Sequence, residues 1–244
     1  MRDYAAETTQ RVAFIRDILT ASGAKGIVYG NSGGKDSALV GILCKLACEN
    51  TVGILLPCGS KRNYSQDKQD GEALAAQYGI AVRCIDLGGT QEALVRALGT
   101  AAQLTDAARA NLAPRLRMTT LYAVAASENR LVAGTGNRSE AYMGYFTKWG
   151  DGACDFNPIG DLTVTEIYEF LRHLDAPAFL LEKAPSAGLF EGQTDEAEMG
   201  VTYRSIDAFL FTGEASPADR RVIDRYHAQS EHKRRAVTVY GGSK

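Results

Sequence analysis

Hydrophobic residues along the chain recur with helical spacing in some segments and form short continuous runs in others. Residues 4–21 carry apolar side chains three or four positions apart and precede Gly23, so this segment predicts a helix. Short β-prone runs predict strands at 26–30, 52–56, 81–86 and 130–134, and further helices are predicted at 37–49, 67–78 and, interrupted at Pro114, 90–129. Because strands and helices alternate, we expect a parallel sheet covered by helices on both faces.

The pattern changes after residue 135, where Gly- and Asp-rich loops separate helices predicted at 163–174, 195–211 and 217–230. No internal repeat and no low-complexity linker divides the chain. We therefore predict a single α/β domain over residues 1–244, built on a doubly wound parallel sheet of about five strands. Its core spans about 23–135, and a loop-rich part follows at about 136–235.

Composition limits the classes of protein to which this chain can belong. Its 27 basic and 29 acidic side chains give a net charge of −2, without the basic excess of a general nucleic-acid binder. No apolar run approaches the roughly 20 residues of a membrane-spanning helix. The five cysteines form no Cys-x-x-Cys pair, which is typical of reduced thiols. We expect a cytoplasmic enzyme or ligand-binding domain that acts without nucleic acid or membrane.

The most informative segment is the loop Gly30-Asn31-Ser32-Gly33-Gly34-Lys35-Asp36-Ser37, which joins a predicted strand to a predicted helix. At such a junction the backbone N–H groups and the helix dipole favour a bound anion. The segment is not a Walker A loop, because Asp36 stands where that motif needs Ser or Thr. A carboxylate in a phosphate loop requires a cation between the two groups, so Asp36 predicts a Mg²⁺ ion.

Residues 32–37 resemble the S-G-G-x-D-S signature of the ATP-pyrophosphatase (PP-loop) superfamily, whose members split ATP between its α- and β-phosphates. The signature implies an adenine-nucleotide alpha-hydrolase-like fold and a substrate activated as an adenylate. Seven further segments indicate one family within this superfamily. With them, the chain resembles ammonia-dependent NAD synthetases from about residue 10 to 235. These segments are 115–118, 134–140, 144–152, 155–162, 183–186, 192–200 and 231–234.

The resemblance implies a reaction and its partners. In this family ATP adenylates the nicotinate carboxylate of deamido-NAD, and ammonia then displaces AMP to leave NAD. The expected small molecules are therefore ATP as co-substrate, Mg²⁺, deamido-NAD and ammonia. The family also forms a twofold dimer with deamido-NAD bound across it, so the apolar face of residues 105–129 is expected to serve a homodimer interface.

The matching motifs imply roles for individual residues. Asp36 and Glu140 match the two acidic metal positions, and together with Asp155 they are the residues expected in catalysis. The expected ATP-binding residues are Gly30, Asn31, Ser32, Gly33, Gly34, Lys35, Asp36, Ser37, Thr135 and Ser186. The expected deamido-NAD-binding residues are Arg115, Lys148, Asp155, His232 and Lys233. A ligand with two phosphates and a carboxylate suits several cations.

Some of these assignments have alternatives. Arg117 replaces Arg115 as the ligand contact if the helix turns a different face inward. His232 is expected to bind and not to transfer a proton, and Asp155 is one possible acceptor for the proton that ammonia loses. For Arg115, Lys148 and His232 the alternative is an ordinary solvated surface charge.

The chain also departs from the family pattern. The family commonly has Lys where this chain has Val164, so that cation is absent or comes from Lys35 or Lys183. Gly188 stands where the family has an acid, whereas Ser186 keeps the hydroxyl. The polar, Gly-rich residues 58–68 and 186–200 are expected to form lids, because adenylates hydrolyse when water enters.

Two other hypotheses compete with an NAD synthetase. The first is a different PP-loop ligase or sulfur transferase, although the slight negative charge is unfavourable for a tRNA substrate. The second is a nucleotide-sensing module that binds ATP without using it. Such a sensor has no need for the two carboxylates at Asp36 and Glu140.

Overall fold

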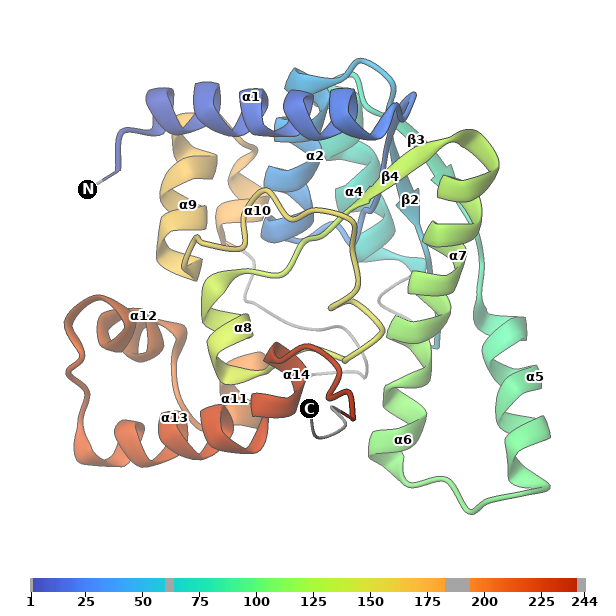
Figure 1. Ribbon diagram of the computed structural model, residues 1–244, viewed down its shortest axis with the longest axis vertical. Helices are drawn as coiled ribbons and strands as arrows, with labels where there is room; N and C mark the ends of the chain where they lie inside the picture. The colour runs from blue at the N-terminus through green and yellow to red at the C-terminus, as the bar shows by residue number, and fades with distance from the viewer. Residues whose placement is uncertain (1, 60–63, 183–193, 241–244) are drawn as a thin grey trace.

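The computed structural model describes residues 2–59, 64–182 and 194–240 (Figure 1). Four strands form one parallel sheet in the order β3-β2-β1-β4. The strands are β1 (Gly26–Gly30), β2 (Thr51–Leu55), β3 (Ala81–Cys84) and β4 (Arg130–Ala133). The helices up to β4 are α1 (Tyr4–Ser22), α2 (Lys35–Ala47), α4 (Gln66–Gln77), α5 (Gly88–Gly99), α6 (Asp106–Ala110) and α7 (Leu112–Glu128). Those after β4 are α8 (Arg138–Met143), α9 (Val164–His173), α10 (Ala178–Glu182), α11 (Asp195–Met199), α12 (Tyr203–Thr212), α13 (Pro217–Gln229) and α14 (Glu231–Arg234).

The sheet confirms the predicted α/β class and its parallel connections, but the described part of the chain has four strands where we predict about five. At the β4 edge, where a fifth strand would pair, the described chain forms only a single parallel bridge between Phe156 and Ala133. Pairing stops there because the Asn157 side chain accepts a hydrogen bond from the backbone N–H of Ile159, which turns the chain. Pro158 between them has no N–H to offer a ladder.

The helices predicted at 4–21, 37–49, 67–78, 163–174 and 217–230 agree with the structure, whereas the one predicted at 90–129 is divided into α5, α6 and α7, and the short helices α10 and α14 were not predicted. Residues 138–143, predicted as loop, form α8, which a capping box between Asn137 and Glu140 begins. The single helix predicted at 195–211 is divided into α11 and α12. Gly200, with φ of 74°, ends α11 in the left-handed conformation that favours glycine.

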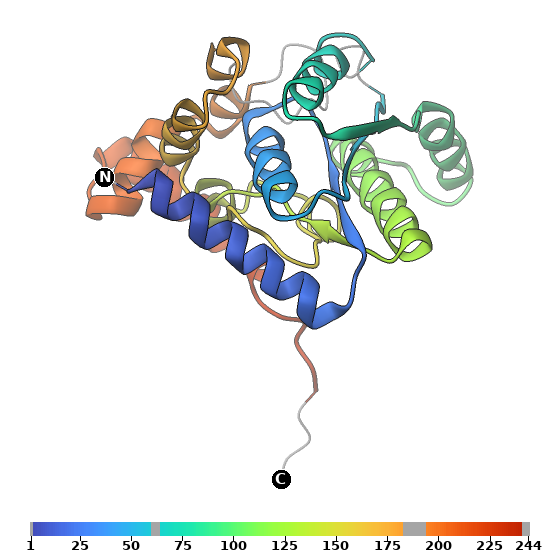
Figure 2. The same cartoon turned by 90° about the horizontal axis from the view of Figure 1, so that it is seen from above.

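Helices cover both faces of the sheet, as Figure 2 shows from above. Alternate residues of β1 face opposite sides: Ile27 and Tyr29 pack with α1, α2 and α9, whereas Val28 packs with α7. A third apolar cluster joins α8 to α11, α12 and α13. In the described part of the chain, no helix combines the length and the hydrophobicity needed to cross a bilayer.

Strand order determines where the site lies. From β1 the chain moves outward to β2 and β3 on one side, and β4 then pairs with the other side of β1. In such sheets ligands bind where the winding direction reverses, at the carboxyl ends of the strands. The segments that leave β1 and β4 at this point are residues 31–37 and 134–140.

Candidate active site

The loop after β1 is held in shape by its own side chains. Ser37 Oγ lies 3.1 Å from Ser32 Oγ and donates to the carbonyl of Gly34 at 3.0 Å. Asn31, which is buried, donates to the carbonyl of Gly71 on α4. Gly33 has φ of 68°, and a Cβ there would meet the Asp67 carbonyl oxygen at 2.3 Å. The loop therefore packs against α4 in one conformation that needs glycine at this position.

Helix α2 begins directly after this loop and has no side-chain cap. Its N-cap is Gly34, so no side chain accepts from the first N–H groups of the helix. Uncapped N–H groups at the positive end of a helix dipole are suited to an anion such as phosphate. Helix α2 is thus arranged as the sequence predicts for a phosphate loop.

The two predicted metal carboxylates come from different segments and meet through Asn137. The Asn137 side chain donates to Asp36 Oδ1 at 3.1 Å, and its backbone N–H donates to Glu140 Oε2 at 3.1 Å. Burial and the nearby charge of Asp36 raise the pKa of Glu140 well above its usual value, and Lys35 opposes this shift. A cation bound between the two carboxylates would relieve this repulsion and favour the ionised form of both.

The chemistry of this pair fits Mg²⁺. Carboxylate oxygens are hard ligands, and Mg²⁺ is usually held by one or two carboxylates together with water and substrate phosphates. Within the described residues, no group of three or more His, Cys, Asp or Glu side chains is arranged to hold a metal. Asp36 and Glu140 could therefore hold part of a coordination shell that phosphate oxygens would complete.

Lys35, at the first position of α2, is buried beside the same pair. Its Nζ lies 2.8 Å from Asp36 Oδ2 and about 6 Å from the ring centres of Tyr168 and Tyr203. Burial alone would lower the pKa of Lys35, but Asp36 and Glu140 raise it above the ordinary value. The side chain is therefore a buried ammonium.

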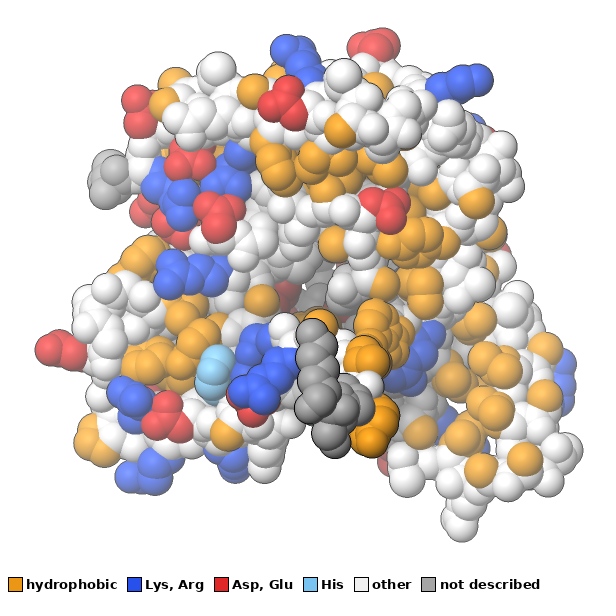
Figure 3. Space-filling model, viewed as in Figure 1, with side chains coloured by type: hydrophobic (Ala, Val, Ile, Leu, Met, Phe, Trp, Pro, Cys, Tyr) orange, Lys and Arg blue, Asp and Glu red, His pale blue; other side chains and the backbone are white. Residues whose placement is uncertain are grey.

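These groups surround a cavity of about 630 Å³, within the range of small-molecule sites. Figure 3 shows the molecule hollowed at its centre, between the upper layer and the C-terminal helices. Among the predicted ATP-binding and metal residues, those that line the cavity are Gly30, Asn31, Ser32, Gly34, Lys35, Asp36, Ser37, Thr135 and Glu140. Gly33 does not line it and contacts α4, as described above.

The residues predicted to bind deamido-NAD divide into two groups. Lys233 lines the cavity, where its Nζ donates to the carbonyls of Gly144 and Phe146, both at 2.7 Å. Arg115, Lys148 and His232 lie outside it in a chain of contacts. Arg115 Nη2 donates to the Lys148 carbonyl, and Lys148 Nζ donates to the His232 carbonyl at 2.6 Å. The single chain thus brings these three together without directing them into the cavity.

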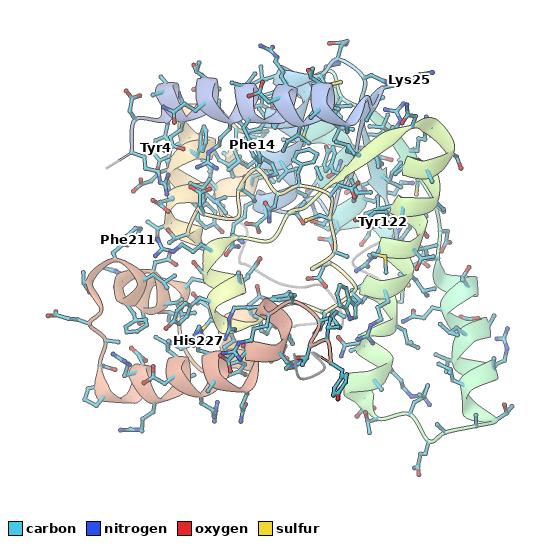
Figure 4. All side chains as sticks on the ribbon, viewed as in Figure 1. Tyr4, Phe14, Lys25, Tyr122, Phe211 and His227 are labelled. Atoms are coloured by element: carbon cyan, nitrogen blue, oxygen red, sulfur yellow. The ribbon has the colours of Figure 1, made fainter. Side chains whose placement is uncertain are left out.

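Asp155 also lies outside the cavity lining. Its carboxylate accepts from Tyr122 on α7, labelled in Figure 4, at 3.2 Å and from the backbone N–H of Val132 at 2.8 Å. These bonds join α7 to β4. Because Asp155 does not face the cavity of the single chain, its catalytic role stays a prediction from the sequence.

Arg117, the sequence alternative to Arg115, does line the cavity. Its Nε donates to the carbonyl of Leu56 at 3.0 Å, and burial lowers the pKa of its guanidinium. Helix α7 therefore turns Arg117 inward and leaves Arg115 exposed. Which arginine faces the cavity depends on how α7 is rotated about its axis against the sheet. The positions of the two arginines in the sequence, i and i+2, do not predict that rotation.

Several predictions fall on or next to residues outside the described ranges. Ser186, Lys183 and Gly188 lie there, as does part of each predicted lid, 58–68 and 186–200. In the described parts, Asp67 and Lys68 line the cavity from α4, and Asp195 and Glu198 line it from α11.

Sequence reasoning missed two carboxylates that support the site. Asp195 is buried and accepts from the Tyr203 hydroxyl at 3.0 Å. Asp207 on α12 is buried too and accepts from Ser139 on α8 and from both the N–H and the hydroxyl of Thr165 on α9. Asp195 lies in a matching family segment, but no local signal identified Asp207.

A glycine-rich phosphate loop, an uncapped helix and a carboxylate pair at the switch point of a parallel sheet define an ATP-binding α/β protein of the PP-loop type. Comparison with known proteins gives the family. The family model described as NAD synthase matches residues 7–244, and the chain belongs to the NAD synthase family.

Individual relatives agree with this assignment. The NH(3)-dependent NAD(+) synthetase of Carboxydothermus hydrogenoformans is 45% identical over 240 residues, covering 97% of this chain and 98% of that protein. The structure of an NMN synthetase from Francisella tularensis is similar at a TM-score of 0.93 and 38% identity, covering 98% of this chain and 99% of the other. That of an NH3-dependent NAD synthetase from Campylobacter jejuni has a TM-score of 0.80 at 30% identity, covering 99% of this chain and 100% of the other.

These comparisons do not support the two competing hypotheses. The family model and the curated relatives bear the name NAD synthase or NAD synthetase, and none of those compared above is a sulfur transferase or a nucleotide sensor. The fold prediction and the family resemblance drawn from the motifs are therefore confirmed.

Proposed function

We propose that this protein is an ammonia-dependent ligase that converts deamido-NAD to NAD and splits ATP into AMP and pyrophosphate. The observation that carries the proposal is the meeting of the phosphate loop with Asp36 and Glu140 in one cavity. Membership of the NAD synthase family supports the choice of substrate.

The reaction has two steps in which one bond forms as another breaks. A carboxylate oxygen of the nicotinate group bonds to the α-phosphorus of ATP, and the bond from that phosphorus to the bridging oxygen of pyrophosphate breaks. The ammonia nitrogen then bonds to the acyl carbon, the carbon–oxygen bond to AMP breaks, and a proton leaves the nitrogen. The first step is needed because a carboxylate is a poor electrophile and oxide a poor leaving group.

The chain's own groups have definite tasks in this scheme. The N–H groups at the start of α2 and the hydroxyls of Ser32 and Ser37 would hold phosphate oxygens where negative charge develops. Asp36 and Glu140 would hold Mg²⁺, which when bound neutralises charge on the departing pyrophosphate. Thr135, two residues after β4, is proposed to contact the nucleotide, and so is Ser186, which lies outside the described residues.

We infer that the acceptor site is completed by a second copy of the chain. Lys233 faces the cavity, whereas Arg115, Lys148, His232 and Asp155 lie outside it on the surface of one chain. The neighbouring helices offer an apolar face: none of the α5 residues is buried, and Leu116, Leu121 and Val124 of α7 are only partly buried. Figure 3 shows hydrophobic side chains along this side of the molecule. A homodimer would cover that face and bring the outer cations against a bound ligand.

The test is a reconstituted reaction. Purified protein is mixed with ATP, MgCl₂, deamido-NAD and ammonium chloride, and NAD, AMP and pyrophosphate are measured. The proposal expects the three products in equal amounts, and omission of any one reactant abolishes them. Folded protein that forms no NAD above the enzyme-free control contradicts it.

A second candidate substrate is nicotinate mononucleotide, which the same chemistry would convert to NMN. It is favoured by the high shape similarity to the NMN synthetase of Francisella tularensis, with a TM-score of 0.93 against 0.80 for the NAD synthetase of Campylobacter jejuni. Comparing kcat/KM for the two acceptors under identical ATP and ammonium decides between them. A higher kcat/KM for the mononucleotide would replace the first candidate by the second.

We also propose a cytoplasmic location. The five cysteines are all free, and Cys44 and Cys58 are buried thiols. Burial raises the pKa of Cys58, which keeps it protonated. Unpaired thiols are typical of a reducing compartment.

A further inference from the structure

Lys35 stands at the variable position of the phosphate-loop signature, between Gly34 and the predicted metal ligand Asp36. A lysine there would be free to extend into solvent or toward a nucleotide. Instead its side chain is only 6% exposed and its ammonium forms an ion pair with Asp36 at 2.8 Å. A buried ammonium therefore lies beside the two carboxylates that are expected to bind Mg²⁺.

The surroundings of the ammonium hold it in place. The rings of Tyr168 on α9 and Tyr203 on α12 lie 6.0 and 5.7 Å from Nζ, close enough for cation–π attraction. Tyr203 is itself fixed, because its hydroxyl donates to the buried Asp195. The α9 position one turn before Tyr168 is Val164, which packs in an apolar cluster and supplies no charge. The positive charge in this corner therefore comes from α2.

Electrostatics explains why the pair needs this charge. Asp36 and Glu140 are partly buried carboxylates held close together by Asn137, and like charges in such a site repel each other. The Lys35 ammonium, 2.8 Å from Asp36 Oδ2, offsets this repulsion. Asn137 bonds both carboxylates but is neutral, so it positions them without offsetting their repulsion.

We propose that Lys35 is the internal counter-ion of the Asp36–Glu140 pair: it keeps both carboxylates in place while no metal is bound, and so weakens the binding of Mg²⁺ until nucleotide phosphates arrive. Mg²⁺ alone must compete with an ammonium that already neutralises one carboxylate. With ATP, the phosphates supply further ligands for the metal and further negative charge for Lys35. The inference rests on the proposed metal site and on no other part of the proposed function.

The experiment measures Mg²⁺ binding to nucleotide-free protein by calorimetry, together with thermal unfolding in EDTA and in MgCl₂. Lys35→Met keeps the apolar stem between the tyrosine rings and removes the charge. It is expected to bind Mg²⁺ roughly tenfold more tightly than the wild type. It should also melt at a lower temperature in EDTA, with the difference shrinking in MgCl₂.

Two controls separate charge from packing. Lys35→Arg keeps the charge and should restore weak Mg²⁺ binding and the wild-type difference between EDTA and MgCl₂. Lys45→Met removes a lysine that pairs with Glu49 at the other end of the same helix, and should leave Mg²⁺ affinity unchanged.

Equal Mg²⁺ affinity in Lys35→Met and the wild type overturns the proposal, as does the absence of Mg²⁺ binding in both. If Lys35→Met folds only in MgCl₂, the proposal is supported. If it folds in neither buffer, a double variant that adds Asp36→Asn decides: it should fold because one negative charge has been removed with the positive one, and its failure assigns Lys35 to packing alone. Since none of these measurements uses deamido-NAD, a failed amidation assay leaves their outcome unaffected.

Discussion

At the residue scale, Asn137 connects the two halves of the site. Its side-chain oxygen accepts from the Glu140 N–H, which begins α8, and its side-chain nitrogen donates to Asp36 on α2. Asn137 is fully buried, so these bonds have little competition from water. One amide thus positions both predicted metal ligands, although they are 104 residues apart in sequence.

Asp36→Asn should reduce NAD formation by about 10²-fold or more while leaving the protein folded, because the amide cannot supply an anionic ligand for Mg²⁺. The measurement is the initial rate at saturating ATP and MgCl₂, with circular dichroism as the check on folding. Asp224→Asn, the same change in an exposed ion pair with Arg220 on α13, is the matched control and should keep the wild-type rate. A rate close to wild type in Asp36→Asn would mean that the metal is held elsewhere.

At the scale of elements, a network of charges attaches α1 to the loop before α9. Arg11 on α1 pairs with Glu7 on the same helix and with Asp161 in that loop. Burial opposes ionisation of both acids, but the hydrogen bonds and the attraction from Arg2 and Arg11 prevail, and the pKa values of Glu7 and Asp161 are lowered. The network stabilises the fold only while these acids are ionised.

The sign of the pH dependence follows from these lowered pKa values. In the unfolded chain the pKa values are 4.5 for Glu7 and 3.8 for Asp161, and folding lowers both. The ionised acids therefore stabilise the folded protein at pH values above the unfolded pKa values, and this stabilisation is lost as the pH falls through the lowered pKa values of the folded state. Arg11→Met should therefore lower the free energy of unfolding by about 1 kcal/mol at pH 7. The difference should shrink below about pH 4.

Urea unfolding at pH 7 and pH 3 measures this effect, and Arg220→Met, which breaks an exposed pair, is the control with a small effect at both pH values. A difference between Arg11→Met and the wild type that stays constant with pH would show that Arg11 acts through packing instead of charge.

Asp207 joins three helices, and its loss should affect both stability and the metal site. Asp207→Ala leaves the Ser139 hydroxyl and the N–H and hydroxyl of Thr165 without their buried acceptor. We expect a loss of about 2–4 kcal/mol in the free energy of unfolding, measured with urea. Because α8 also carries Glu140, the Mg²⁺ concentration for half-maximal activity should rise. Asp207→Asn keeps one acceptor oxygen and should be intermediate, and wild-type stability in Asp207→Ala would contradict the assigned role.

At the scale of the whole molecule, the single chain leaves the apolar side chains of α5 and several of α7 only partly buried, and four of the five predicted acceptor residues lie outside the cavity. Ala123 is an exposed residue of α7 on that side. Ala123→Glu should cost little in an isolated chain, whereas in a buried interface it places an unpaired charge that is strongly unfavourable.

Sedimentation equilibrium should therefore show a dimer for the wild type and a shift to monomer for Ala123→Glu, with an increased KM for the acceptor. The matched control is Ala21→Glu, the same change at an exposed alanine of α1. A wild-type monomer, or a dimer that Ala123→Glu leaves intact, would assign the interface elsewhere.

The sequence by itself determined the features that depend on neighbouring residues. The strands β1, β2 and β4 follow from short apolar runs, and the phosphate loop follows from glycines and serines between a strand and a helix. Gly23 and Gly200 end helices by their positive φ, although the second of these ends was not predicted. The pairing of Asp36 with Glu140 also follows from motifs, because both come directly after strands that a parallel sheet aligns.

Only the tertiary structure decided what depends on how these elements pack. The rotation of α7 directs Arg117 inward and Arg115 outward, and the packing of α12 on α8 and α9 makes Asp207 a common acceptor. The same packing buries Lys35 between two tyrosines from distant helices. These contacts join residues from about 40 to 170 positions apart. Such pairs are set by the register and twist of the sheet, which no local pattern of residues encodes.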